Sequence, residues 1–341
     1  MPAGLIAFSV ALIASLSLTV PARQLALRMG MVDHPGPRKV HVKPIPLLGG
    51  LAIYCGVILA ILISTGGKAL SQMVGILAGA TLVVLVGVLD DQGLLHHQIK
   101  LFVGMPAAAL MLMASGIHAQ VLSAVLRGQA GQLADAALTI VWVVGITAAF
   151  SILDHMDGLC AGVAAMASAF FTFFAHSSGQ VLVTTLAAAV LGAAIGFLRW
   201  NFNPAKIFMG DGGAMFLGFM MATLGLKLRL AEPPPPAGWM IPVLILGVPI
   251  FDTTLVSISR SRRGLLPFAA PGKDHTAHRL ANLGLGQRRA VLALYGLGGV
   301  FGVVTVLVSR LPAPQGYAVG GATLLVGLLA VGLLERAPYE Q

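Results

Sequence analysis

Long apolar runs dominate the chain, and short polar segments separate them. A helix needs roughly 20 apolar residues to cross a bilayer, and eleven runs approach that length. We predict helices over residues 3–20, 48–66, 71–89, 101–117, 136–153, 158–175, 180–198, 212–230, 239–258, 290–309 and 316–334. The first run has no basic residue before it, so we expect a retained span rather than a signal peptide. The pattern predicts an all-α polytopic membrane protein.

The composition agrees with that class. Hydrophobic residues make up 57% of the 341 residues and charged residues only 10%, whereas soluble domains contain about 25% charged residues. Cys55 and Cys160 lie in or beside apolar runs, which indicates no disulfide framework. No linker or repeat marks an internal boundary, so we expect one membrane domain over residues 1–341.

The net charge of +9 is better explained by membrane topology than by nucleic-acid binding. If the N-terminus lies outside, 16 of the 21 lysines and arginines fall in the segments on the inner side. Positively charged residues collect in cytoplasmic loops, so this count favours an N-terminus outside the cell.

Acids and histidines gather in the same inner segments, which the distribution of positive charge does not explain. They are His34, His41, His96, His97, His155, His275, His278, Asp33, Asp90, Asp91, Asp154, Asp157, Asp211 and Asp274. Acidic side chains at a membrane are costly and are functional by default. These segments predict one polar site at the cytoplasmic face. A transporter is the alternative from another class, because an intramembrane acid such as Asp252 also marks ion pathways.

Three acids at the ends of apolar runs are the first candidates for metal or phosphate chemistry. Asp90 and Asp91 end the third run, where they repel each other and face the negative end of a helix dipole. A turn would explain one of them but not two. Asp211 precedes the eighth run and is a candidate helix N-cap, a role that does not exclude a metal ligand.

Asp154 and Asp157 lie three residues apart, with His155 between them. On a helix this spacing places both carboxylates on one face. One acid is enough to cap the run that follows, so the pair favours a functional role.

Two basic segments are candidates for anion binding. His275 and His278 would share a helix face, and Arg279 lies beside them with a fork of donors that suits phosphate. A zinc pair and a solvated loop helix are the alternatives. His41 and Lys43 belong to a loop that either binds a polyanion or only anchors the chain at the membrane.

Taken together and in order, these motifs resemble those of the polyprenyl-phosphate N-acetylhexosamine-1-phosphate transferases of glycosyltransferase family 4. The matching segments, between about residues 33 and 289, are DHPGPRKVH, PIPLLGG, GVLDDQG, DHMDGL, NFNPAKIFMGDGG, PIFDT and DHTAHRL. Such enzymes move a sugar 1-phosphate from a UDP-sugar to a membrane polyprenyl phosphate and release UMP. The resemblance implies a multi-pass plasma-membrane enzyme that uses Mg²⁺, with Mn²⁺ as a substitute, at a cytoplasmic active site.

The resemblance also points to a branch of the family. PIPLLGG and His-x-x-His-Arg look more like the N-acetylglucosamine-1-phosphate branch, which primes cell-envelope glycans, than like phospho-N-acetylmuramoyl-pentapeptide transferase, which is the alternative. The family often shows NxxNxxDG where this chain has Ser151, Asp154 and Asp157–Gly158. That departure keeps an inactive lipid-binding homologue as a further alternative. A homodimer is left open.

The resemblance implies a division of roles among the acids. Asp211 is expected to be the chief magnesium ligand, assisted by Asp91 or Asp154, because hard oxygen ligands suit this ion. Asp90 is expected to activate the lipid phosphate, as a base or as a nucleophile, and Asp91 is the second catalytic candidate.

The other candidates are expected to bind substrate. The donor diphosphate or sugar is assigned to His275, His278 and Arg279. The lipid phosphate or the diphosphate is assigned to Lys43, His41 and Lys206. Asp157 and Asn201 complete the substrate-binding set.

Overall fold

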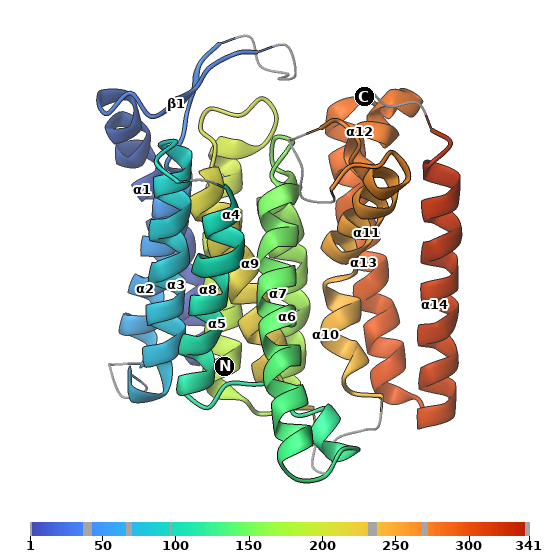
Figure 1. Ribbon diagram of the computed structural model, residues 1–341. Coiled ribbons are helices and arrows are strands. Elements are labelled where there is room, and N and C mark those ends of the chain that lie inside the picture. The colour runs from blue at the N-terminus through green and yellow to red at the C-terminus, as the bar shows by residue number, and fades with distance from the viewer. Residues whose placement is uncertain are drawn as a thin grey trace. The chain divides into compact units, whose positions relative to one another are not determined.

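The computed structural model describes residues 2–36, 43–65, 70–95, 97–230, 237–266 and 272–337. The chain divides into two compact units, both built from helices (Figure 1). Unit 1 contains Met1–His34 and Lys43–Leu230, and unit 2 contains Pro35–Val42 and Ala231–Gln341. The prediction of a single domain stays a prediction.

Unit 1 holds the first nine α-helices of the chain order. They are α1 (Pro2–Arg28), α2 (Gly49–Thr65), α3 (Leu70–Asp91), α4 (His97–Ile99), α5 (Met105–Ala114), α6 (Gln129–Leu153), α7 (Leu159–Ser177), α8 (Val181–Asn201) and α9 (Gly210–Lys227). A π-helical turn, η1 (Lys100–Gly104), precedes α5, and a 3₁₀ turn, η2 (Leu122–Ala124), precedes α6.

Unit 2 continues with α10 (Met240–Ile245), α11 (Gly247–Arg262), α12 (Thr276–Leu280), the π-helical turn η3 (Ala281–Leu285), α13 (Gly286–Arg310) and α14 (Ala313–Leu334). The predicted span 239–258 is therefore divided between α10 and α11. Pro249 lies in the first turn of α11, where its missing N–H costs no helical hydrogen bond.

Helix α9 is the centre of unit 1. Every residue from Gly212 to Leu224 is buried, and the helix packs against α2, α3, α6, α7 and α8. A helix that is apolar on all sides is stable only when neighbours cover it. Trp142 of α6 ties the two helices together by donating from Nε1 to the carbonyl of Ala222, at 3.1 Å.

Two glycine contacts bring α2 and α3 against the first turn of α9. A Cβ added at Gly50 would lie 2.3 Å from the Cα of Gly213, and one added at Gly87 would lie 2.4 Å from the Cα of Gly212. Only residues without a side chain permit this separation, as in other close helix pairs in membranes. The start of α9 is therefore held between the ends of two other helices.

A short hairpin lies beside the same turn. β1 (Val32–Asp33) pairs antiparallel with β2 (Ile45–Pro46), with Val32 opposite Pro46. The carbonyl of Pro46 accepts from the N–H of Phe208, and the N–H of Gly49 donates to the carbonyl of Phe208, both at 2.9 Å. The PIPLLGG segment thus pairs with the residues that lead into α9.

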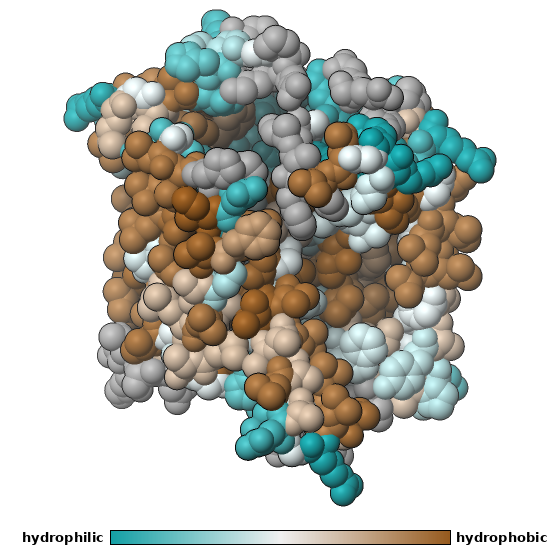
Figure 2. Space-filling model, in the orientation of Figure 1, coloured by the Kyte–Doolittle hydropathy of each residue, from teal (hydrophilic) through white to brown (hydrophobic). Residues whose placement is uncertain are grey.

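Seven helical segments among the described residues are long and apolar enough to cross a membrane: Pro2–Arg28, Met73–Asp91, Gln129–Leu153, Leu159–Ser177, Val181–Asn201, Thr276–Arg310 and Ala313–Leu334. Large apolar side chains such as Leu5, Val141 and Leu329 are exposed. Figure 2 shows apolar surface along the helices, with hydrophilic residues near their ends. The chain is a helical, multi-pass membrane protein. All eleven predicted spans overlap helices, whereas the number of crossings and the orientation stay predictions.

Candidate active site

Asp90, Asp91 and Asp211 meet where α3 approaches α9. The two adjacent aspartates are the last residues of α3, and Asp211 is the second residue of α9. Gly87, one turn before the pair, packs against the backbone of Gly212. Because neither glycine has a side chain, the helices come close enough to place the three carboxylates together.

Lys100 bridges two of these acids. Its Nζ donates to Asp90 Oδ2 at 2.6 Å and to Asp211 Oδ2 at 2.5 Å, and its side chain is 18% exposed. From the sequence we identify Lys100 only as one of the inner-side positive charges, and its place in the site was not predicted. The available signal was its position, a single lysine at the start of an apolar run that follows the aspartate pair.

Asp91 caps the N-terminus of α9 from the neighbouring helix. Its Oδ1 accepts the N–H of Asp211 at 2.9 Å, and its Oδ2 accepts the N–H of Gly212 at 3.3 Å. Gly210 has φ +70°, and a Cβ there would lie 2.4 Å from Asp91 Oδ2. The capping alternative considered for Asp211 is therefore wrong: Asp91 performs it, and Asp211 lies inside the first helical turn.

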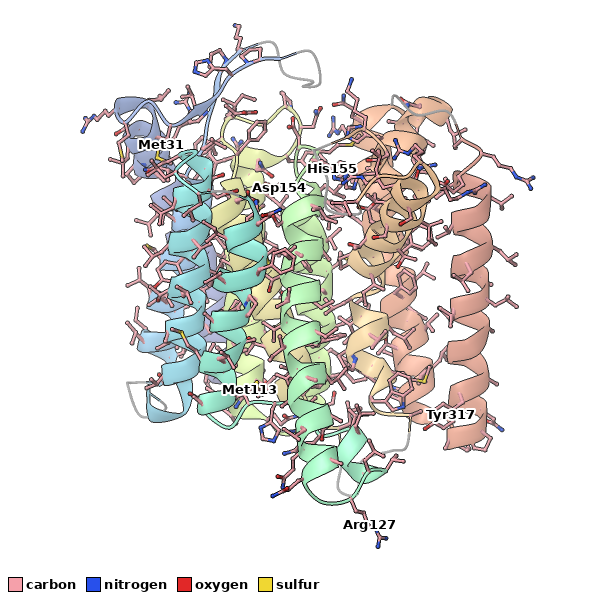
Figure 3. All side chains as sticks on the ribbon, viewed as in Figure 1. Met31, Met113, Arg127, Asp154, His155 and Tyr317 are labelled. Carbon is pink, nitrogen blue, oxygen red and sulfur yellow. The ribbon has the colours of Figure 1, made fainter. Side chains whose placement is uncertain are left out.

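Ser151 and Asp154 approach the same acids from the end of α6. The hydroxyl of Ser151 donates to Asp211 Oδ1 at 2.6 Å. Asp154 directly follows the helix, as labelled in Figure 3. Burial, and after it the carboxylates of Asp211 and Asp91, raise the pKa of Asp154 to about 8. Because neighbouring carboxylates contribute to this shift after burial, added positive charge at the site would favour the ionised form of Asp154.

We call Asp90, Asp91, Asp154 and Asp211 the acid cluster. The described hydrogen bonds bring one cation to it, the ammonium of Lys100. Four carboxyl groups share this one ammonium, and hard carboxylate oxygens are the ligands that Mg²⁺ prefers. The residues present therefore fit a magnesium ion.

Asp157 and Asn201 hold the loop before α9. Asp157 Oδ2 accepts from Asn203 Nδ2 at 3.1 Å and from the N–H of Ala205 at 2.9 Å. Asn201 is 1% exposed; its Oδ1 accepts the N–H of Gly158 and its Nδ2 donates to the carbonyl of Ile207, both at 3.0 Å. Both side chains, predicted to bind substrate, make these contacts inside the protein.

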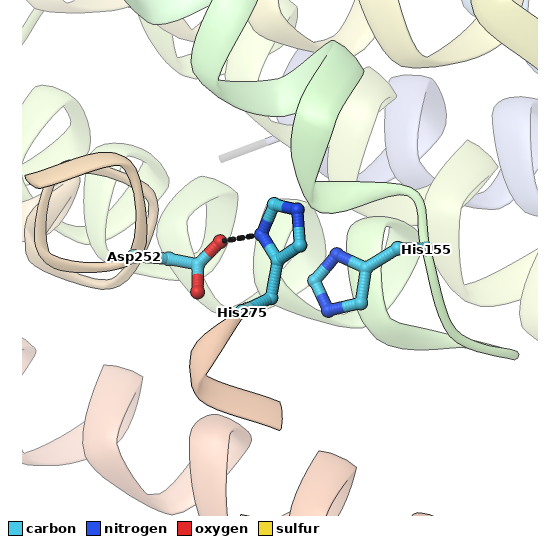
Figure 4. A group of neighbouring side chains, drawn as sticks. All are labelled: His155, Asp252 and His275. Carbon is cyan, nitrogen blue, oxygen red and sulfur yellow. Dashed lines mark hydrogen bonds and ion pairs between the residues drawn. The ribbon is translucent and has the colours of Figure 1, made fainter. Parts of the chain in front are cut away.

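In unit 2, His275 pairs with Asp252. The ring Nδ1 of His275 lies 2.8 Å from Asp252 Oδ2 (Figure 4), and Asp252 Oδ1 accepts the N–H of Thr276 at 2.7 Å. The ring of His278 is centred 6.4 Å from that of His275. Asp252, the residue that motivated the transporter alternative, thus binds a histidine and the backbone of the same unit.

Asp274, the residue before His275, is bound by two arginines. Arg260 donates from Nε and Nη2 to the two carboxylate oxygens, at 2.9 and 3.0 Å, and Arg263 Nη2 donates to Oδ2 at 2.6 Å. Although burial opposes it, the hydrogen bonds and charge of Arg260, followed by the hydrogen bond of Arg263, hold the pKa of Asp274 well below its usual range.

Arg279 is fully buried, with 0% exposure. Its guanidinium donates to the carbonyl of Asp274 at 2.9 Å, to Ser259 Oγ at 2.8 Å and to the carbonyl of Leu334 at 2.7 Å. It also forms an ion pair with Glu335 at 2.7 Å. The guanidinium predicted to bind substrate is thus bound to Ser259 of α11, to the loop between α11 and α12, and to the end of α14.

The remaining candidates lie in unit 1 or outside the described residues. Lys43 is exposed just before β2. Lys206 is exposed, with its Nζ 5.6 Å from the ring centre of Trp200, and its carbonyl accepts from Arg23 Nε at 3.2 Å. His41 lies outside the described residues.

Comparison with known proteins relates this chain to one family of glycosyl transferases. The model of glycosyl transferase family 4 matches residues 73–229, a range that includes the whole acid cluster and Lys100. The chain is 38% identical, over 304 residues, to a probable undecaprenyl-phosphate N-acetylglucosaminyl 1-phosphate transferase of Bacillus subtilis. That alignment covers 89% of this chain and 84% of the relative.

Two further relatives carry related names. A decaprenyl-phosphate N-acetylglucosaminephosphotransferase of Mycolicibacterium smegmatis is 32% identical, with 93% of this chain and 85% of the relative covered. An undecaprenyl-phosphate alpha-N-acetylglucosaminyl 1-phosphate transferase of Yersinia pestis is 26% identical, with 95% and 89% covered.

Proposed function

The chain belongs to glycosyl transferase family 4, and we propose that it transfers N-acetylglucosamine 1-phosphate from UDP-N-acetylglucosamine to a polyprenyl phosphate, releasing UMP. The observation that carries the proposal is the acid cluster bridged by Lys100, within a chain similar over most of its length to relatives named for this transfer. The product would be a polyprenyl-diphosphate sugar that primes a cell-envelope glycan.

The setting of the reaction is part of the proposal. The eleven apolar runs and the positive residues on one side support a plasma-membrane protein with its N-terminus outside and its active site at the cytoplasmic face. A polyprenyl chain would then stay in the bilayer while its phosphate reaches the polar end of the helices. A single transferase domain and a homodimer stay open to test.

We propose Mg²⁺ as the ion of the acid cluster, with Mn²⁺ as a substitute. Asp211 is the chief ligand, because Ser151 and Lys100 hold its two oxygens in place, and Asp91 or Asp154 assists it. When bound, the ion would neutralise the negative charge of the donor diphosphate. The raised pKa of Asp154 supports this assignment, since a carboxylate there is stabilised by added positive charge.

Asp90 is proposed to act on the lipid phosphate, either as a base or as a nucleophile. The ammonium of Lys100 lies 2.6 Å from Asp90 Oδ2, where it would compensate the charge of the ionised carboxylate that either role requires. Because the same ammonium binds Asp211, Lys100 also fixes the proposed catalytic carboxylate and the proposed metal-binding carboxylate close to each other.

Both reactants are anions, so the barrier depends on charge compensation and positioning. His275, His278, Lys43, His41 and Lys206 are proposed to supply donors to the diphosphate, the sugar or the lipid phosphate. Arg279, Asp157 and Asn201 also belong to the predicted binding set, but their contacts inside the protein favour a positioning role.

The test is product formation by the purified protein. With polyprenyl phosphate, Mg²⁺ and UDP-N-acetylglucosamine, we expect UMP and a lipid that is heavier by N-acetylglucosamine phosphate in mass spectrometry. UDP-N-acetylgalactosamine and UDP-N-acetylmuramoyl-pentapeptide serve as alternative donors. Turnover of only the pentapeptide donor would replace the proposed branch by the other one. No turnover of any donor by folded protein would contradict transferase activity.

A further inference from the structure

The segment Lys273–Leu280 combines two kinds of side chain. Asp274 and Arg279 bind protein groups, whereas His275 and His278 are the proposed substrate ligands. We infer that Asp252 is a positioning residue for the transfer: its carboxylate fixes both the ring orientation and the protonated nitrogen of His275. The catalytic importance of this contact rests on the proposed function, but the contact itself does not.

The carboxylate of Asp252 divides its two oxygens between a ring and a backbone. Oδ2 lies 2.8 Å from His275 Nδ1, and Oδ1 accepts the N–H of Thr276 at 2.7 Å (Figure 4). Asp252 is 1% exposed and His275 is 4% exposed, so water does not compete for these contacts. Because the backbone bond fixes the carboxylate plane, the ring of His275 is held in one orientation.

The identity of the partner then determines where the ring carries its proton. An ionised carboxylate has no proton to donate, so Nδ1 must be the donor in this contact. In the neutral ring, Nε2 is therefore an acceptor; in the charged ring, Nε2 carries a proton and becomes a donor suited to a phosphate oxygen. In both states Asp252 directs Nε2, rather than Nδ1, to act on the diphosphate of the nucleotide-sugar donor.

The backbone on both sides of His275 is fixed as well. Asp274 is held by Arg260 and Arg263, and its carbonyl accepts from Arg279 Nε. Thr276 is held through its N–H by Asp252. Charged groups of the same unit therefore hold three consecutive residues. A solvated loop helix, the alternative considered for this segment, would not need these contacts.

The first measurement is the tautomer of His275 in the intact protein in detergent, from the ¹⁵N resonances of its ring. It is made at a pH at which the ¹⁵N resonances show the ring to be neutral. Replacement of His275 by Asn assigns the signals. We expect the proton on Nδ1. A neutral ring protonated on Nε2 in the wild-type protein would overturn the inference without any substitution at Asp252.

The second measurement uses Asp252→Asn, which keeps the size of the side chain and an oxygen for the N–H of Thr276. Its amide group would donate to Nδ1, so the ring proton should move to Nε2. We expect kcat/KM for the nucleotide-sugar donor to fall by about 10- to 100-fold, the usual effect of losing a residue that orients a functional histidine. Unchanged kcat/KM with a moved proton would refute the role in transfer.

Asp274→Asn is the matched control, because it alters the neighbouring buried acid, which binds arginines instead of a histidine. It should lower the melting temperature while His275 keeps its proton on Nδ1. A moved proton in this variant would mean that general loosening, and not Asp252, sets the tautomer. Absence of wild-type transfer would count against the proposed function, and the tautomer result would still decide the structural part.

Discussion

The carboxyl groups of the acid cluster in unit 1 and of Asp274 in the segment Lys273–Leu280 of unit 2 have opposite electrostatic surroundings. In unit 2, Asp274 is bound by two arginines, and its pKa lies well below its usual range. In unit 1, burial and neighbouring acids raise the pKa of Asp154 to about 8. In unit 2, Asp274 and Asp252 are each paired with arginine or histidine side chains of that unit, whereas the described hydrogen bonds bring one ammonium, that of Lys100, to the acid cluster.

The paired acids of unit 2 suit a structural role, whereas the acid cluster of unit 1 suits a reaction site. A carboxylate that is already paired has a structural use, since removing its partner leaves a buried charge uncompensated. A group of acids with excess negative charge is unfavourable by itself and becomes favourable when a cation binds. We therefore expect substitutions in the acid cluster to affect chiefly transfer, and those in the unit 2 frame to affect chiefly stability.

The largest expected effect is on transfer, from Asp211→Asn. Loss of the chief metal ligand should lower kcat by at least about 10³-fold, because charge compensation is the main source of catalysis here. UMP release measures the rate, and a wild-type melting temperature shows that the fold is retained. Activity within tenfold of wild type would contradict the metal assignment of Asp211.

The largest expected effect on stability is from Asp274→Asn. This change leaves the guanidinium groups of Arg260 and Arg263 without their carboxylate, which costs about 3–5 kcal/mol for a buried pair. Thermal unfolding in detergent should show a clear decrease in melting temperature. Lys43→Gln is a suitable control, because Lys43 is exposed and should leave the melting temperature unchanged. Equal stability of both variants would argue against the framework role.

A smaller effect is expected from Gly87→Ala. The added methyl group would meet the backbone of Gly212 and push α3 away from α9, an overpacking change that costs about 1–3 kcal/mol. Because the same contact brings Asp90 and Asp211 together, transfer should fall along with stability. Gly145→Ala is the matched control, since nothing lies within 4 Å of a Cβ there. If both variants behave alike, the glycine contact does not set the geometry of the cluster.

A further expected effect is a pH dependence of stability in metal-free protein. The folded-state pKa of Asp154 is raised to about 8, so the folded protein retains a proton that the unfolded chain has lost. The free energy of unfolding should therefore fall as pH rises from ~4, the ordinary carboxyl pKa, to about 8. Melting temperatures in a chelator measure it, and Asp154→Asn should make the slope shallower. An unchanged slope in that variant would assign the effect to other groups.

The sequence predicts the helices and the chemistry of the acids better than their partners. Apolar runs identify the long helices, since a bilayer demands a minimum length of apolar helix, but they do not include the short helices α4 and α12. The run 239–258 contains a break that hydropathy does not reveal. Asp90, Asp91 and Asp211 are recognisable as site residues because acids at the ends of membrane helices are energetically costly and are usually functional.

Partners far apart in the chain are harder to predict. Asp91 caps a helix that begins about 120 residues later, and Lys100 binds an acid 111 residues away. Such contacts depend on the crossing of α3 and α9, which two glycines permit. For Arg279 the sequence predicts a different partner. A guanidinium suits phosphate, but in the structure it binds Ser259 and two carbonyls.

The central claim is that the acid cluster requires a divalent cation for transfer. The most direct measurement is UMP release by the wild-type protein, with saturating lipid phosphate and nucleotide sugar, as Mg²⁺ is titrated from a chelated start. We expect no release in chelator, a saturable rise with Mg²⁺, and no rise in Asp211→Asn at any Mg²⁺ concentration. Full release in chelator, or an identical Mg²⁺ response in Asp211→Asn, would contradict it.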